Sequence, residues 1–83
     1  MDINSTNIFD VKDINNTLVK DTLNDAVESL EERGYNSINQ LVGYLISGDP
    51  GYISNYKETR KKLSKIDRAD IIEVLLRSYL SRK

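Results

Sequence analysis

The sequence has no cysteine and no histidine among its 83 residues, no tryptophan and a single proline. Without cysteine no disulfide can form, and without thiolate or imidazole ligands a structural zinc site is not expected. The same absence removes Ser-His and Cys-His nucleophile pairs and the imidazole acid/base that many enzyme sites use. We therefore expect no enzymatic activity, no cofactor and no metal.

Long apolar runs are also missing. The longest lies near residues 41–46, far short of the roughly 20 residues that span a bilayer as a helix. Residues 1–4 lack a basic segment followed by an apolar stretch, so no signal peptide is expected. These absences predict a cytoplasmic protein that does not enter a membrane.

The short chain favours self-association. A domain of this size buries only about 60% of the surface that its unfolded chain exposes, and oligomerisation is one remedy when disulfides and metals are excluded. The charge is unevenly spread: residues 1–34 carry eight acids and three bases, while residues 35–83 carry five acids and nine bases. Halves of opposite sign can attract a second copy or an acidic partner.

Apolar residues recur with helical spacing in most of the chain, and no stretch alternates with the period of a strand. The pattern predicts helices over residues 14–33, 38–47 and 68–80, with a weaker one over residues 56–66. Residues 1–12 show no period and are interpreted as a flexible regulatory tail, and residues 13–83 as a helical domain. The expected fold class is all-α, a small bundle of about four helices.

The expected buried faces follow from the same spacing. In the first helix the face consists of Leu18, Thr22, Leu23, Ala26, Val27 and Leu30. In the last helix it consists of Ile71, Ile72, Leu75, Leu76, Tyr79 and Leu80. Both sets repeat at three- and four-residue intervals, which places them on one side of a helix.

Capping residues mark the expected helix ends. The predicted N-terminal caps are Asp13, Asp67 and the Ser37–Gln40 capping box, and the predicted terminating glycines are Gly34 and Gly48. Gly43 lies in the middle of the second helix, where glycine costs about 1 kcal/mol relative to alanine. Close approach of another backbone and simple tolerance both explain it.

The basic stretch, residues 57–68, is the most conspicuous charge feature. It holds six bases against Glu58 and Asp67. One interpretation is a docking surface for an acidic protein, a phosphate group or nucleic acid. A solvated helix face is the other interpretation, and it is favoured from sequence alone. Nucleic-acid binding through this stretch is kept as the alternative function, although the chain is acidic as a whole.

Residues 30–50 resemble the IreB regulatory phosphoprotein family of Gram-positive bacteria. The resemblance extends to Thr6-Asn7-Ile8-Phe9, Arg60 and Arg68. It implies a non-enzymatic, intertwined homodimer that is phosphorylated by a transmembrane PASTA-type Ser/Thr kinase and dephosphorylated by a cognate phosphatase. Such proteins act as negative regulators of intrinsic cephalosporin resistance and cell-wall synthesis, with a cell-wall precursor enzyme or its protease machinery as the implied downstream partner.

The resemblance also assigns residues. Thr6 matches the threonine of the family's phosphorylated T-x-x-F motif, and Ser5 is a second candidate because Ile3 occupies the position where some members carry another threonine. Partner binding or phosphate docking is expected at Arg60, Arg68, Lys57 and Lys61. The expected dimer core is Tyr35, Ile38, Leu41, Val42, Tyr44 and Leu45.

Overall fold

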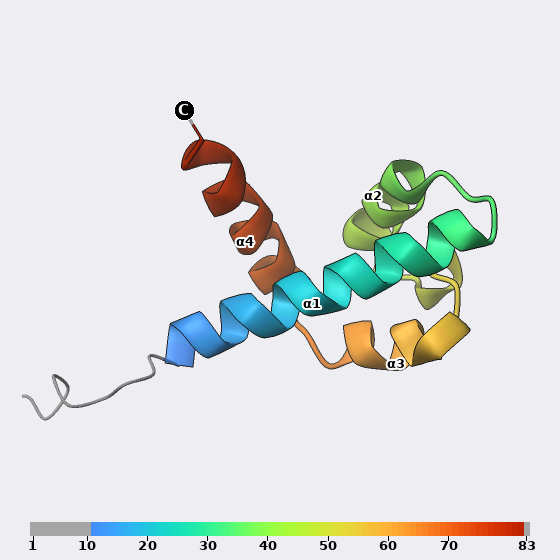
Figure 1. Cartoon of the computed structure of the whole chain (residues 1–83), viewed down its shortest axis with the longest axis horizontal. Coiled ribbons are helices and arrows are strands. Elements are labelled where there is room, and N and C mark those ends of the chain that lie inside the picture. The colour runs from blue at the N-terminus through green and yellow to red at the C-terminus, as the bar shows by residue number, and fades with distance from the viewer. Residues whose placement is uncertain (1–10, 83) are drawn as a thin grey trace, which may run out of the picture.

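The computed structural model describes residues 11–82, and within them every regular element is helical (Figure 1). The elements are α1 Val11–Glu32, α2 Ser37–Ser47, η1 Pro50–Tyr52, η2 Tyr56–Glu58, α3 Thr59–Ser64 and α4 Arg68–Leu80, where η denotes a 3-10 helix. This confirms the all-α class and the expected number of α-helices for the described part of the chain.

Helix α1 is the spine of the molecule. It contacts α2, α3 and α4, with α2 and α4 on one side and α3 on the other (Figure 1). Its buried residues are Val19, Thr22, Ala26, Ser29 and Leu30. Three of these were expected to be buried, whereas Leu18 was expected inside and is exposed. The core therefore lies along a face of α1 slightly rotated from the predicted one.

The ends of α1 test two of the predicted caps. The helix already includes Val11, so Asp13 lies within it and cannot be its N-cap. At the other end Gly34 has φ +83°, Tyr35 N–H donates to Leu30 O at 2.9 Å, and Gly34 N–H donates to Glu31 O at 3.0 Å. These are the two bonds of a Schellman motif. The prediction for Gly34 is confirmed and that for Asp13 is wrong.

Helix α2 is capped one residue earlier than expected. Asn36 is its N-cap, and the Asn36 side chain accepts a hydrogen bond from Asn39 N–H at 3.0 Å. Ser37 instead donates its hydroxyl proton to Glu31 Oε2 at 3.0 Å, which ties α2 to the end of α1. Gly48, with φ +77°, ends the helix as predicted. The Ser37–Gln40 capping box is therefore wrong, because an asparagine side chain already fills the role.

Gly43 is explained by a side chain and not by a backbone. A Cβ atom built on Gly43 would lie 2.5 Å from Cε1 of Tyr52, so the tyrosine ring rests directly on this part of α2. Gln40, one turn earlier, donates its Nε2 proton to Tyr52 O at 3.0 Å. The missing Cβ lets the loop after α2 fold back onto the helix.

Replacing Gly43 with valine is expected to lower the free energy of unfolding by about 1–2 kcal/mol, because the overpacking cost exceeds the gain in helix propensity. Urea unfolding followed by circular dichroism measures this loss. In a Tyr52→Ala background, where the ring is absent, Gly43→Val should cost little. An equal cost in both backgrounds would show that the ring is not the cause.

Helix α3 is shorter than the predicted 56–66 segment. Lys57 and Glu58 both have φ +59°, in the left-handed region, and this breaks the helix before Thr59. Thr59 is fully buried and donates its hydroxyl proton to Ser54 O or Tyr56 O. Left-handed conformations are costly for residues with a Cβ. The buried threonine hydroxyl stabilises the turn that leads into α3.

Helix α4 differs most from its prediction. Of the six residues expected to be buried only Ile71 is, together with Val74. The other five, Ile72, Leu75, Leu76, Tyr79 and Leu80, are exposed in the isolated chain. Asp67 occupies the N-cap position, but its side chain makes no capping hydrogen bond. Ile71 and Val74, one helical turn apart, therefore provide the buried apolar surface of α4, which packs on α1. The other apolar side chains of α4 face solvent.

Candidate interaction surface

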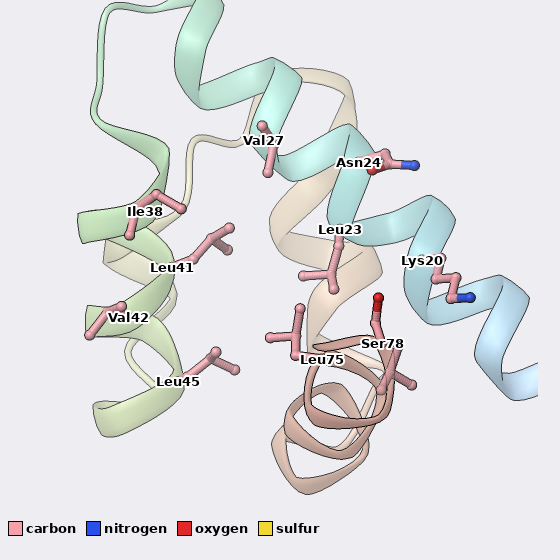
Figure 2. Close-up of a pocket in the computed structure, with 11 residues that line it drawn as sticks. Lys20, Leu23, Asn24, Val27, Ile38, Leu41, Val42, Leu45, Leu75 and Ser78 are labelled. Carbon is pink, nitrogen blue, oxygen red and sulfur yellow. The ribbon is translucent and has the colours of Figure 1, made fainter. Parts of the chain in front are cut away.

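A groove lies between α1, α2 and α4 (Figure 2). It encloses about 520 Å³. Its walls are apolar and consist of Leu23, Val27, Ile38, Leu41, Val42, Leu45, Val74 and Leu75, while Lys20, Asn24 and Ser78 supply the polar atoms at one end. Grooves of this size lined by aliphatic side chains bind apolar surface. We call this feature the apolar groove.

The side chains of the α2 wall have the helical spacing predicted for them. Ile38 is 68% exposed and Val42 is 49% exposed, while Leu41 and Leu45 are partly buried against the core. From α4, Leu75 is 44% exposed and faces the same space. Contiguous exposed apolar surface of this kind marks an interaction site.

The expected dimer-core residues are thus not all alike. Ile38, Leu41, Val42 and Leu45 line the apolar groove. Tyr35 is exposed in the turn before α2 and outside the groove. Tyr44 is buried in the core of the single chain, and its assignment to the dimer core stays a prediction. Sequence periodicity shows that Tyr44 is on the α2 helix but does not distinguish the two sides of a wide apolar stripe.

The basic stretch is partly neutralised by α1. Lys57 Nζ lies 3.2 Å from Glu28 Oε1, and Lys62 Nζ lies 3.2 Å from Asp25 Oδ2. The hydrogen bond and charge of Glu28 raise the pKa of Lys57. The ring of Tyr56 lies 5.4 Å from Lys57 Nζ and 5.9 Å from the Arg33 guanidinium carbon. Two of the six charges that suggested nucleic-acid binding are therefore paired within the chain.

Two arginines of the stretch bind backbone carbonyls. Arg60 donates from Nε to Ile53 O at 2.6 Å, and Arg68 donates from Nη1 to Leu45 O at 3.0 Å. The second bond places a cation at the C-terminal end of α2, where the helix dipole favours positive charge. Arg60 therefore holds the loop between α2 and α3, and Arg68 joins the start of α4 to the last turn of α2. Lys61, the fourth expected docking residue, is exposed on α3.

Thr6 and Ser5 lie outside the described residues, so the structure does not place them. In the part of the chain that is described, no three potential metal ligands come together. None of the helices there has both the length and the apolar character needed to cross a bilayer.

The described helices and the apolar groove between them define a small all-helical protein. The family model described as IreB regulatory phosphoprotein matches residues 4–81. That match covers nearly the whole chain, and the protein therefore belongs to the IreB family of regulatory phosphoproteins.

Proposed function

We propose that this protein is a non-enzymatic, cytoplasmic regulator that acts as a homodimer and is controlled by phosphorylation of Thr6. The observation that carries the proposal is the family match over residues 4–81, which includes the Thr6-Asn7-Ile8-Phe9 motif. The family is one of regulatory phosphoproteins. We propose that the protein acts by binding other proteins. The helical body would supply the binding surface, and phosphorylation would add negative charge near that surface.

The homodimer is supported by the apolar residues that the isolated chain leaves uncovered. The walls of the apolar groove and the outer face of α4 would both bury apolar surface against a second copy. Burial of each large aliphatic side chain contributes about 1.5–3 kcal/mol. A core as small as this one gains correspondingly from a shared interface.

The pathway follows from family membership. The proposed kinase is a transmembrane Ser/Thr kinase with PASTA domains, opposed by a cognate phosphatase. The proposed output is negative regulation of intrinsic cephalosporin resistance, through an enzyme of cell-wall precursor synthesis or the protease machinery that degrades it.

A kinase assay tests the phosphorylation site. The cytoplasmic kinase domain should label the wild-type protein and the Ser5→Ala variant to similar extents, whereas Thr6→Ala should abolish labelling. The two variants remove neighbouring hydroxyls, so each is the control for the other. Equal labelling of Thr6→Ala and wild type would reject Thr6, and mass spectrometry of protein from cells with and without the kinase would then locate the true site.

Arg60 and Arg68 stay in the proposal as contacts for an acidic partner, but their backbone hydrogen bonds change how this must be tested. Alanine at position 60 would release the loop between α2 and α3, and alanine at position 68 would release the end of α2 from α4, in addition to the loss of charge. The urea midpoint must therefore be measured beside partner binding, with Lys61→Ala as a variant that removes one charge and none of the loop hydrogen bonds.

A further inference from the structure

A second, polar pocket lies between α1 and α4. It is lined by Asn16, Lys20, Val74, Arg77, Ser78 and Ser81 and encloses about 150 Å³. It shares Lys20, Val74 and Ser78 with the apolar groove, so it continues that groove at one end. Figure 2 shows Lys20 on α1 and Ser78 on α4 at this end.

The lining of the polar pocket suits a phosphate group. Two cations, the Ser78 hydroxyl and an amide can donate hydrogen bonds to phosphate oxygens, while the Ser81 hydroxyl already donates to Ser78 O at 3.0 Å. Arg77 gives its Nε proton to Glu73 at 2.7 Å, and a guanidinium has four further N–H donors.

We propose that the polar pocket formed by Lys20, Arg77, Ser78 and Ser81 binds the phosphate of phosphorylated Thr6 from the same chain. This inference rests on the proposed phosphorylation of Thr6 and adds where the phosphate goes. Because the pocket adjoins the apolar groove, the docked phosphate lies beside the surface that binds a second copy or a partner.

Reach favours this pocket over the part of the basic stretch near Lys57. Lys20 is nine residues beyond Val11, about 14 Å along α1 at 1.5 Å per residue. The five residues from Thr6 to Val11 span up to about 17 Å when extended. Lys57 lies beside Glu28, which is about 26 Å along the same helix. Phosphothreonine can therefore reach Lys20 of its own chain and cannot reach Lys57.

Charge favours it over the other pocket near this half of α1. That pocket, between Leu18 and the turn that joins α3 to α4, contains Lys65 but also Asp67 and Asp70. Two carboxylates would repel a phosphate that carries close to two negative charges. In the polar pocket, the two cations outweigh Glu73 and the partial negative charge at the end of α4.

The test uses full-length, 15N-labelled protein with phosphothreonine installed at position 6 by genetic code expansion. We expect phosphorylation to shift the backbone amide resonances of Lys20, Ser78 and Ser81. The shifts should fall to background in Lys20→Gln/Arg77→Gln. They should persist in Lys61→Gln/Lys65→Gln, which removes the same charge from α3 and the turn after it.

Three results would overturn the proposal: no change at the polar pocket, equal shifts in both double variants, or shifts centred on residues 57–62. The amide spectra of the unphosphorylated variants show whether each is folded, so a folding defect is recognised separately. The phosphate is installed without the kinase, so the docking test does not depend on the kinase assay. Failure of the kinase to label Thr6 would reject the proposed function, whereas the amide shifts alone decide whether the phosphate docks in the polar pocket.

Discussion

Replacing Leu75 with aspartate is expected to convert the proposed homodimer, with twice the 9.5 kDa chain mass, into a monomer. Leu75 lines the apolar groove from α4 and is 44% exposed in the single chain. In a homodimer that fills the groove, the new carboxylate would be buried without a partner, which costs several kcal/mol. A loss of that size raises the dissociation constant by at least about 100-fold. Light scattering and analytical ultracentrifugation measure it.

The matched control is Ser64→Asp. It adds the same charge on α3, which lies across α1 from the apolar groove (Figure 1). This variant should keep the mass of the wild type. If Leu75→Asp remained dimeric at the same concentration, the groove would not be the interface and a different apolar surface of α4 would have to be considered. Circular dichroism establishes that both variants are still helical.

Replacing Leu30 with alanine is expected to lower the free energy of unfolding by about 2–5 kcal/mol. Leu30 is 1% exposed and is among the largest fully buried side chains of the described residues. Its carbonyl also accepts the Tyr35 N–H bond that closes α1. A chain of 83 residues has a total stability of order 4–12 kcal/mol, so this one cavity removes a large part of it. Urea unfolding at fixed protein concentration measures the loss.

Leu18→Ala is the control for this prediction. It is the same chemical change on the same helix, at a side chain that is 53% exposed. We expect a loss below about 1 kcal/mol, as is usual for exposed positions. Equal losses at Leu18 and Leu30 would mean that Leu18 is also buried in the species that unfolds, and therefore that the dimer interface extends to the start of α1.

The sequence predicts the helices well because each is specified locally. Apolar spacing places α1, α2 and α4, and the glycines at positions 34 and 48 mark where two of them end. The errors at the starts have a physical cause: several polar residues near each start can cap, and the sequence does not show which one is used. Asn36 replaces Ser37 as the cap of α2 because Ser37 is bonded to Glu31.

Features that depend on distant residues could not be predicted. The left-handed pair Lys57 and Glu58 has no glycine to reveal it, and Lys57 is bonded to Glu28 of α1, 29 positions earlier in the chain. The ion pair between Lys62 and Asp25 joins residues 37 positions apart. From sequence alone the basic stretch therefore resembles an unpaired basic surface. In the structure, two of its lysines are paired with carboxylates of α1.

The candidate site was half predicted. The sequence predicted the apolar stripe of α2, and residues of that stripe line one wall of the groove. Only the family resemblance linked them to a dimer. The α4 wall was interpreted as the chain's own core, since periodicity shows that a face is apolar and not what covers it. No sequence motif joins Lys20 and Arg77, because isolated cations on two separate helices form a site only when the fold brings them together.

The hydrogen bond from Arg68 to Leu45 O joins two walls of the apolar groove. Arg68 is the first residue of α4, and Leu45 lies in the last turn of α2. One polar contact therefore joins the C-terminal end of α2 to the N-terminal end of α4, the two helices that form opposite walls of the groove. This hydrogen bond holds the two helices together at one end of the groove. A partner that moves the two helices apart must weaken the hydrogen bond between Arg68 and Leu45 O. The Gly48 amide, which is bonded to Tyr44 O, lies nearby and outside the bound surface. Its hydrogen-exchange rate would therefore report the opening.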